Sequence, residues 1–304
     1  MKRRMVIAGG SGFIGSALAA DWLALGGEAI VLTRSPRQRD DGATEVQWDA
    51  VHIGEWIQYL DRAEAVVCLA GKNINCRHTS EAVRELAESR ISAVQTIAAG
   101  IRHMTKPPGV WIQAGAIGFY GNTGDAVLDE RSPSGAGTLA GICQQWERAF
   151  ESESVPRTRK VLLRIGVVLG RDGGALPVLA RLTRRFLGGR AGNGKQFVSW
   201  IHLKDLTRMF LESSRRADLA GTFNAVAPGP VTNKEFMHQL RRVLRRPWSP
   251  SAPGWAIKIG ARFTGTEPSL ALEGCRVLPA RFTEAKFEFE YPELPDALTD
   301  LCQA

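Results

Sequence analysis

Four glycines lie within seven positions near the start of the chain, in the segment Gly9-Gly-Ser-Gly-Phe-Ile-Gly15. Gly10, Gly12 and Gly15 match the G-x-G-x-x-G spacing of a dinucleotide-binding turn. In such a turn the first glycines permit a tight bend, Gly12 lets the backbone approach a pyrophosphate, and Gly15 lets the following helix lie close to the strand. The start of that helix offers its amides and the positive end of its dipole to the phosphates.

The neighbouring residues fit the strand and the helix that this turn needs. An apolar run at 5–8 has the length and β-branching of a buried parallel strand, and an amphipathic pattern follows at 14–25. A second strand is predicted at 28–33, at the distance expected within a β-α-β unit. This context favours a nucleotide-binding turn over a glycine-rich turn without a ligand.

The end of the second predicted strand distinguishes between the two nicotinamide cofactors. An NAD-binding unit usually places an acidic residue there, on the ribose 2′-hydroxyl. In this chain the segment reads Thr33-Arg34-Ser35. Because a guanidinium suits a 2′-phosphate and the flanking hydroxyls could add hydrogen bonds, the sequence favours NADP(H) over NAD(H). Arg37 and Arg39 follow closely, and we expect them to lie in a solvated loop.

Strand and helix patterns alternate as far as about residue 170. Strands are predicted at 5–8, 28–33, 44–48, 65–69, 110–114 and 160–168, and helices at 14–25, 80–103 and 139–153. This alternation predicts an α/β fold of the Rossmann type, with a doubly wound parallel sheet. Further along, glycines and prolines break the pattern into short pieces. We expect an NADP(H)-binding domain at 1–170 and a smaller C-terminal α/β lobe at 171–304, with returns to the sheet, that contacts the substrate or a partner.

The composition narrows the class of protein. The chain has 304 residues, of which 44% are hydrophobic and 23% charged, so it can bury a sizeable core. No apolar stretch approaches the roughly 18 residues of a membrane span, so we expect no membrane association. The five cysteines are odd in number and lack the spacing of metal ligands, which predicts reduced thiols, a cytoplasmic location and no metal site.

The net charge of +8 is uneven, with arginine-rich segments at 181–190 and 241–246. Solvated helix faces are the simplest interpretation, and contact with the phosphate or carboxylate of a small-molecule ligand is the alternative. No nucleic-acid-binding motif is recognised in these segments, so nucleic acid is not favoured as a partner. The sequence leaves the oligomeric state open.

Further motifs follow the glycine turn in the order found in extended short-chain dehydrogenases/reductases. They are Leu69-Ala-Gly71, Phe119-Tyr-Gly121, Leu163-Arg-Ile-Gly-Val-Val-Leu-Gly170 and Trp200-Ile-His-Leu-Lys-Asp205. Within that superfamily the chain resembles an atypical subgroup, the epimerase family proteins, which carry a C-terminal domain of unknown function. The finer resemblance rests on Ser89-Arg90, Trp146-Glu147, Arg171-Asp-Gly-Gly174, Phe223-Asn-Ala-Val-Ala-Pro228 and Arg276-Val-Leu-Pro279.

The resemblance implies where the parts of the cofactor bind. The pyrophosphate is expected along the glycine turn, the adenosine ribose phosphate at Arg34, the adenine near Asp49 and a ribose above Leu69-Ala-Gly71. A surface loop carboxylate is the alternative for Asp49. The predicted cofactor residues are Gly9, Gly10, Ser11, Gly12, Phe13, Ile14, Gly15, Thr33, Arg34, Ser35, Asp49, Leu69, Ala70 and Gly71.

The standard catalytic residues of the superfamily are missing from this chain. Its members use Tyr-x-x-x-Lys, in which the lysine lowers the pKa of the tyrosine, and an upstream serine or threonine that holds the substrate oxygen. The corresponding helix reads Gly137-Thr-Leu-Ala-Gly-Ile-Cys-Gln-Gln-Trp-Glu147, without tyrosine or lysine. Gly115 stands where the subgroup often has a serine.

Three residues are candidates for proton transfer in their place. Tyr120 follows a predicted strand near the expected nicotinamide end, although a packed aromatic residue is the alternative. Lys72 directly follows Leu-Ala-Gly, where it could face the cofactor or remain a solvated loop lysine. His202 titrates near neutral pH and is either a pocket residue or a histidine satisfied within the core.

Three functions therefore remain open, and two of them are favoured. One is an NADP(H)-dependent oxidoreductase or epimerase in which the cofactor supplies the hydride and the protein orients the substrate and supplies a proton by other means. The other, motivated by the loss of all three standard groups, is an NADP(H)-binding regulatory or scaffold protein without turnover. Nucleic-acid binding through the arginines is the least favoured interpretation.

Overall fold

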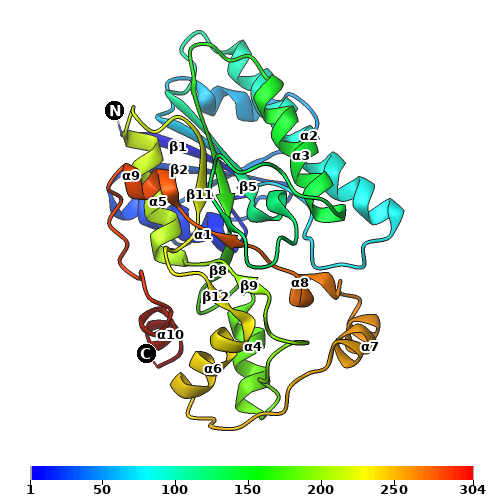
Figure 1. Cartoon of the computed structure of the whole chain (residues 1–304). Helices are drawn as coiled ribbons and strands as arrows, with labels where there is room; N and C mark the ends of the chain where they lie inside the picture. The colour runs from blue at the N-terminus through cyan, green and yellow to red at the C-terminus, as the bar shows by residue number, and fades with distance from the viewer. Residues whose placement is uncertain (1, 304) are drawn as a thin grey trace.

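A seven-stranded parallel sheet forms the centre of the computed structural model, which describes residues 2–303 (Figure 1). Its strands are β1 (Arg4–Ala8), β2 (Glu28–Thr33), β3 (Thr44–Gln47), β4 (Ala65–Cys68), β5 (Val110–Ala116), β7 (Arg159–Ile165) and β11 (Gly221–Ala225). They lie in the order β11-β7-β5-β4-β1-β2-β3. Because the chain order reverses between β1 and β4, the carboxyl ends of these two strands form the place where such sheets bind ligands. The predicted Rossmann-type fold is confirmed.

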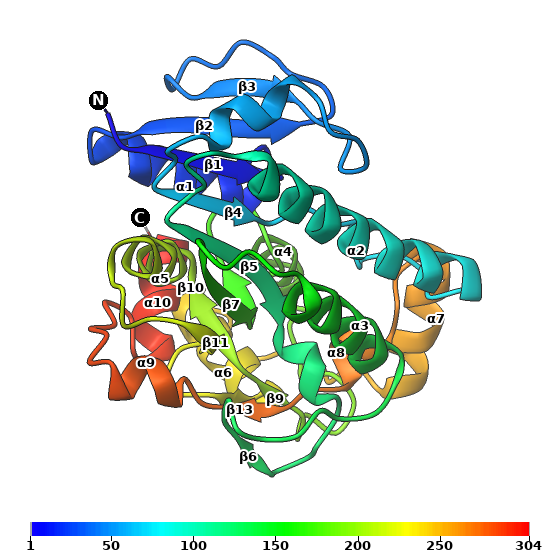
Figure 2. The same ribbon diagram turned by 90° about the horizontal axis from the view of Figure 1, so that it is seen from above.

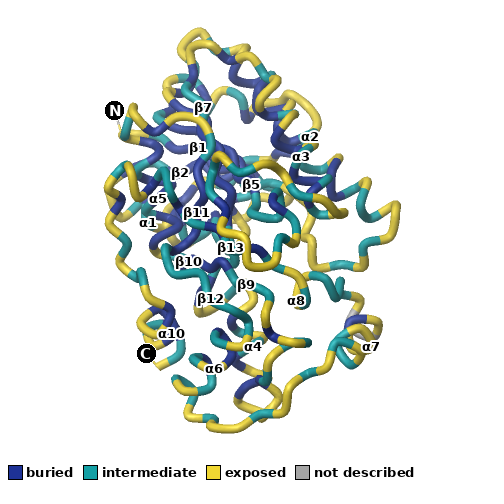
Figure 3. The backbone as a smooth tube through the Cα atoms, in the orientation of Figure 1, coloured by how far each residue is buried: buried dark blue, intermediate teal, exposed yellow. Residues whose placement is uncertain are grey.

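Helices cover both faces of the sheet (Figure 2). On one face lie η1 (Glu55–Leu60), α2 (Ser80–His103) and α3 (Thr138–Ser152), and on the other α1 (Phe13–Ala24) packs against α5 (Leu203–Arg215). Since both faces are covered, the central strands are built from apolar residues that water does not reach. The four residues of β4 and the last four of β1 are all buried (Figure 3).

The strand predicted at 160–168 is divided in two. β7 ends at Ile165, and β8 (Val167–Leu169) leaves the main sheet to pair with β10 (Trp200–His202). The break falls at Gly166, where a Cβ would lie 2.5 Å from the Ser199 carbonyl oxygen. The prediction of one continuous strand was wrong because the apolar run carries no sign of this second partner.

The remaining elements lie beside and below the sheet, and most of those from the C-terminal part of the chain form the lower half of the molecule in Figure 1. They are η2 (Ile117–Tyr120), β6 (Val127–Leu128), α4 (Leu176–Arg184), β9 (Phe197–Val198), β12 (Val231–Thr232), α6 (Asn233–Val243), α7 (Gly254–Thr264), α8 (Ser269–Leu272), β13 (Arg276–Val277), α9 (Ala280–Glu284) and α10 (Leu294–Gln303), some of which lie against the sheet. The chain returns to the sheet through β11, on which α9 packs with the Phe223 and Phe282 rings 5.0 Å apart. The division at residue 170 stays a prediction.

No helix in residues 2–303 is long and apolar enough to cross a membrane. No group of three or more histidine, cysteine or acidic side chains in that range is arranged to hold a metal ion.

Candidate cofactor site

The glycine turn joins β1 to α1 at the point where the strand order reverses. Gly9 has a φ of +77°, in the left-handed region that favours glycine, and its amide donates to the Leu32 carbonyl at 3.1 Å. A Cβ on Gly9 would lie 3.0 Å from the Ala70 amide nitrogen, so the turn passes directly against the segment after β4. Two of the predicted cofactor segments are therefore adjacent.

Gly12 lies at the N-cap of α1, where the protein itself does not require a glycine. Its φ of −81° and ψ of 174° are ordinary extended angles, and a Cβ would meet only the Gly9 carbonyl oxygen, at 3.4 Å. No side chain caps the first turn of α1, and Ile14 packs into the core, so the first backbone amides remain for a ligand. Open space over a glycine beside unpaired helix amides is what a pyrophosphate needs, and the turn fits that group.

Gly15 and Phe13 fix the position of α1. A Cβ on Gly15 would lie 2.5 Å from the Gly10 Cα, so this glycine lets α1 approach the end of β1, as its place in the motif predicts. The Phe13 ring lies against Gly170 and Gly173, where any Cβ would overlap it. The Phe13 amide, rather than its ring, is thus the group suited to a phosphate.

The end of β2 lies beside the glycine turn. Ser11 Oγ is 3.5 Å from Thr33 Oγ1, which brings the two segments together. Arg34 and Ser35 are exposed at this edge. Arg34 forms no ion pair with any residue in the described part of the chain, so its guanidinium is free to bind an anion.

The next two arginines belong to the loop, as expected. Arg39 pairs with Asp41 and, at 3.3 Å, with Glu45. These hydrogen bonds, above all that to Asp41, raise the pKa of Arg39. The Arg37 amide donates to the Glu45 carboxylate at 2.8 Å. Arg39 is therefore held by carboxylates of its own loop, whereas the guanidinium groups of Arg34 and Arg37 form no ion pair with the residues that the structure describes.

The segment after β4 carries the next predicted contacts. The Leu69 amide donates to the Ala8 carbonyl at 2.8 Å, which holds this segment beside the glycine turn. Leu69 and Ala70 are half-buried, whereas Gly71 is exposed. A Cβ on Gly71 would lie 3.0 Å from Arg90 Cγ, so the backbone here passes against a side chain of α2.

Arg90 is a functional candidate that sequence reasoning noted only as part of a motif. Its guanidinium lies 5.1 Å from the centre of the Trp146 ring and donates to the Leu86 carbonyl at 2.9 Å. Burial lowers its pKa, and it has no carboxylate partner among the described residues. A partly buried cation without a counter-ion beside Gly71 is suited to an oxygen of a bound ligand.

Lys72 and Asp49 have partners of their own. Lys72 Nζ pairs with Glu85 on α2, and this contact raises the pKa of the lysine, so it stays a cation at the surface rather than a base. The Asp49 carboxylate accepts the amides of Val51 and His52 at 2.9 and 2.8 Å, which lowers its pKa. A contact between Asp49 and adenine stays a prediction.

A cavity of about 660 Å³ opens between the start of α1 and the start of α5. Gly12 lines it from the glycine turn and His202 from the opposite side. The fold thus brings one of the three proton-transfer candidates to the phosphate turn. Neither Tyr120 nor Lys72 is among the described residues that line this cavity.

His202 is the N-cap residue of α5. Its Nδ1 accepts the Lys204 amide at 3.1 Å, its Nε2 lies 3.3 Å from the Asp300 carboxylate, and its ring stacks on Tyr291 at 3.9 Å. Burial lowers its pKa, although Asp300 opposes the shift. A neutral ring with the proton on Nε2 satisfies both contacts. A catalytic role for His202 remains a prediction, and its visible role is to cap α5.

Tyr120 is enclosed by the protein. Its side chain is 0% exposed, and its hydroxyl lies 2.8 Å from Asn224 Oδ1, 2.9 Å from the Asp129 carbonyl oxygen and 2.9 Å from Arg164 Nη1, which donates to it. Burial raises the pKa of the phenol. The prediction of Tyr120 as a proton donor is corrected: a satisfied hydroxyl without access to solvent cannot meet a substrate, and the packed aromatic is the better interpretation.

A buried ion pair continues from Tyr120 toward α3. Arg164 on β7 donates from Nη2 to Glu147 Oε2 at 2.8 Å and from Nε to Oε1 at 3.0 Å, and it stacks over the Phe119 ring at 3.6 Å. Both charged side chains are less than a tenth exposed. Arg164 counteracts the effect of burial, which raises the pKa of Glu147. The pair with its hydrogen bonds forms a closed polar network rather than a reactive one.

Cys143 lies one helical turn before Glu147 on α3. Burial, and then the nearby Glu147 carboxylate, raise its pKa to about 12, so the thiol is protonated and a poor nucleophile. A Cβ on Gly118 would lie 3.5 Å from Cys143 Sγ, and one on Gly115 would lie 3.6 Å from Glu147 Oε1. Gly115, Gly118, Cys143 and Glu147 therefore lie close together, and the Cys143 and Glu147 side chains are buried.

Comparison with known proteins agrees with this architecture. Residues 5–225 match the NAD dependent epimerase/dehydratase family, and residues 252–301 match a domain of unknown function, DUF1731. The chain belongs to the NAD dependent epimerase/dehydratase family. The predicted resemblance to extended short-chain dehydrogenases/reductases of the epimerase family protein subgroup is confirmed.

Three relatives illustrate the match. The epimerase family protein SDR39U1 homolog, chloroplastic, of Arabidopsis thaliana is 36% identical over 303 residues, which cover 98% of this chain and 86% of that protein. A crystal structure of human epimerase family protein SDR39U1 with NADPH has a TM-score of 0.89 at 31% identity and 99% coverage of both chains. The nucleoside-diphosphate sugar epimerase of Corynebacterium glutamicum has a TM-score of 0.78 at 32% identity, covering 99% of this chain and 58% of that one.

Proposed function

We propose that this chain binds NADPH at the carboxyl ends of β1, β2 and β4. The observation that carries the proposal is Gly12, where space for a side chain is left open over helix amides that no protein group caps. The human relative, similar over its whole length, holds NADPH in its crystal structure. In this arrangement the amides of Phe13 and Ile14 hold the pyrophosphate.

The preference for the phosphorylated cofactor is assigned to Arg34. It is exposed beside the glycine turn and lacks an ion pair in the described structure, and no carboxylate lies at the end of β2 to bind a ribose 2′-hydroxyl. A guanidinium can donate two parallel hydrogen bonds to a phosphate. Ser35 and Thr33 supply hydroxyls on either side of it, as the sequence predicts.

The reaction that best fits these residues is reduction of a carbonyl compound. When bound, NADPH supplies a hydride to the carbonyl carbon, while water gives a proton to the oxygen, so the products are an alcohol, NADP⁺ and hydroxide. Epimerisation through a ketone would in addition need a base that removes a hydroxyl proton. The buried Tyr120 and the protonated Cys143 do not supply one.

Arg90 is assigned to the developing negative charge on the substrate oxygen. It lies against Gly71, where a cofactor ribose is expected, and it has no carboxylate to neutralise it in the part of the chain described. A preformed cation in a partly buried position stabilises an alkoxide without reorganisation. In this proposal the charge of Arg90 stabilises the alkoxide, and the proton comes from water, so no side chain of the protein has to donate one.

A screen with NADPH and a panel of carbonyl compounds and nucleotide sugars tests the proposal, read as loss of the reduced nicotinamide signal. Turnover that falls at least about tenfold in Arg90→Met, but not in Arg84→Met, supports it. Arg84 is the matched control because it lies on the same helix and is exposed beside Glu88. Consumption of NADPH that is unchanged in Arg90→Met would contradict the role of Arg90.

A second function is favoured by one observation, the sealed Glu147–Arg164 pair. Since Cys143 and Glu147 occupy the helix that carries the catalytic tyrosine and lysine in the superfamily, and Glu147 is paired with Arg164 of β7, the chain could hold NADPH without turning it over, as a regulatory or scaffold protein. NADPH binding with no turnover across the whole panel supports this second function and contradicts the reductase.

A further inference from the structure

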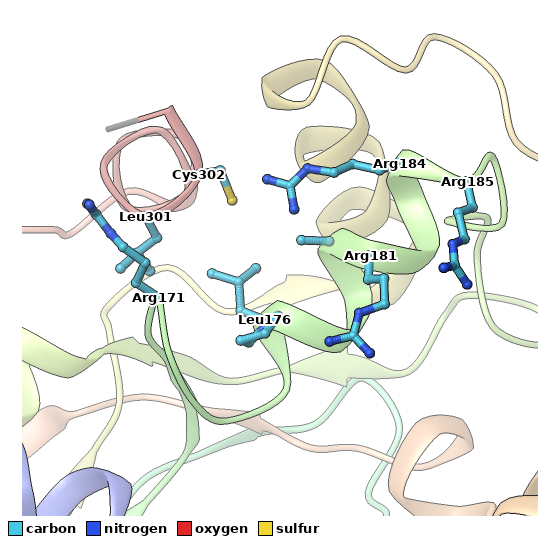
Figure 4. Close-up of a pocket in the computed structure, with 9 residues that line it drawn as sticks. Arg171, Leu176, Arg181, Arg184, Arg185, Leu301 and Cys302 are labelled. Carbon is cyan, nitrogen blue, oxygen red and sulfur yellow. The ribbon is translucent and has the colours of Figure 1, made fainter.

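A cavity of about 500 Å³ lies in the C-terminal lobe between α4 and α10 (Figure 4). Four of the described residues that line it are arginines and none is acidic: Arg171, Arg181, Arg184 and Arg185. Its volume is in the range of cavities that take small molecules. The glycine turn does not line it, so it is distinct from the cavity beside Gly12.

No carboxylate of residues 2–303 forms an ion pair with the four arginines of this cavity. Arg181, Arg184 and Arg185 form no ion pair with any residue in the described range. Arg171 Nη2 donates to the Asp300 carbonyl at 2.8 Å, and no carboxylate in the described part of the chain pairs with this arginine. Cations that share a partly enclosed space repel one another, and an anion placed between them removes that repulsion.

Two of the arginines approach the cavity from opposite walls. Figure 4 shows Arg184 extending from α4 toward Cys302 on α10, and Arg171 lying beside Leu301. Both guanidinium groups are close enough to Cys302 to oppose the rise in its pKa that burial causes. An anionic group near Cys302 would therefore lie between two cations.

The rest of the lining is apolar. Leu176 at the start of α4 points into the gap, and Leu301 faces it from α10. Their apolar surface would gain nothing from a free inorganic anion, whereas a hydrocarbon group would bury it. Because arginines and leucines line the same cavity, its lining is suited to an amphipathic anion. The charged group of such a ligand would contact the arginines, and its hydrocarbon part would contact the leucines.

We propose that the cavity between α4 and α10 binds a small carboxylate or phosphate ester with an apolar body, its anionic group between Arg171 and Arg184 and its body against Leu176 and Leu301. Arg171 and Leu301 also line the cavity beside the glycine turn, so the two sites share a wall. The second ligand would thus bind next to the proposed NADPH site without overlapping the phosphate turn.

Cys302 offers a local readout of this binding. It is half-buried in the cavity wall, whereas Cys76, also half-buried, lies elsewhere and serves as an internal control. Alkylation by iodoacetamide, followed by peptide mass spectrometry, gives the rate at each cysteine. Octanoate and octyl phosphate should slow alkylation of Cys302 at concentrations about tenfold lower than octanol needs, while the rate at Cys76 is unchanged. The more effective of the two anions identifies the head group.

The variants Arg184→Met and Arg171→Met keep an apolar stem and remove one cation each. Both should lose the advantage of the anions over octanol, while Arg84→Met, outside the cavity, should keep it. Equal protection by octanol and octanoate, no protection by either anion, or full protection in both cavity variants would overturn the proposal. Thermal unfolding of each variant identifies any that does not fold, and NADPH titration shows whether the first site is intact.

Discussion

Gly12→Ala should abolish tight NADPH binding in a protein that stays folded. The added Cβ would meet only the Gly9 carbonyl oxygen, at 3.4 Å, and the backbone angles suit any residue. Removing a glycine from the unfolded chain gains about 0.4–1 kcal/mol, and losing glycine at an N-cap that has no side-chain hydrogen bond opposes this gain. The free energy of unfolding should therefore change by less than about 1 kcal/mol.

The effect on binding should be much larger, because the methyl group would occupy the space proposed for the pyrophosphate. A loss of at least about 1.4 kcal/mol, or tenfold in Kd, is expected. Gly15→Ala is the matched comparison. Its Cβ would lie 2.5 Å from the Gly10 Cα, so α1 would have to move away from β1, at a cost of about 1–3 kcal/mol in stability.

Urea unfolding and calorimetric titration with NADPH separate the two effects. Gly12→Ala should unfold at the urea concentration of the unmodified protein and bind NADPH weakly, whereas Gly15→Ala should unfold at lower urea. Undiminished NADPH binding by a folded Gly12→Ala variant would refute the placement of the pyrophosphate over this glycine.

Three further outcomes follow from the same geometry. Arg34→Ala should weaken NADPH binding by about 1–3 kcal/mol and leave NADH binding nearly unchanged in parallel titrations, because only NADPH carries the 2′-phosphate; an equal loss for both cofactors would contradict this role. Tyr120→Phe should lower the free energy of unfolding by about 1–3 kcal/mol in urea, because it leaves Arg164 Nη1 and Asn224 Oδ1 short of a partner, and should not change NADPH affinity; a loss of binding without a loss of stability would restore Tyr120 to the site. His202 has a lowered pKa in the folded state, so the unfolded chain binds more protons as the pH falls below about 6.5, and stability should decrease there and be fully present above that pH. Asparagine can still cap α5, so in His202→Asn the thermal midpoint should depend less on pH at and below about pH 6.5. An unchanged pH dependence of the midpoint in this variant would show that other titratable groups cause it.

The fold was predictable from sequence wherever a local pattern determines an element. The apolar run of β1, the glycine turn and the periodicity of α2 each report their own structure, since strand burial and helix amphipathicity have different periods. α2 lies at Ser80–His103, as its pattern predicts, with Thr79 as its N-cap residue. The alternation of such strands and helices then predicted the doubly wound parallel sheet, although not the order of its strands.

The elements that sequence reasoning missed depend on distant partners. β11 joins the sheet by pairing with β7, and β8 leaves it to pair with β10. The residue pattern of neither segment shows which strand it pairs with. The same limit applies to side chains. Glu147 could be recognised as part of a motif, but its burial against Arg164 could not, because the two residues meet only through the packing of α3 on the sheet.

The residues of the candidate site likewise fall into those that the sequence could predict and those that it could not. The glycines and Arg34 follow from strand ends, so their proximity could be inferred from parallel topology. Tyr120 was misplaced because its position after a strand does not reveal that Asn224 and Arg164 enclose its hydroxyl. Arg90 could not be singled out from the sequence, because its lack of a carboxylate partner among the described residues becomes apparent only in the folded structure.

Calorimetric titration of the unmodified protein with NADPH and with NADH tests the central claim most directly. The geometry at Gly12 and Arg34 predicts one site per chain and tighter binding of NADPH, by about tenfold or more, since a charge-assisted contact to the 2′-phosphate is available only to that cofactor. Equal affinities for the two cofactors would contradict the role of Arg34, and no binding of either would contradict the cofactor site itself.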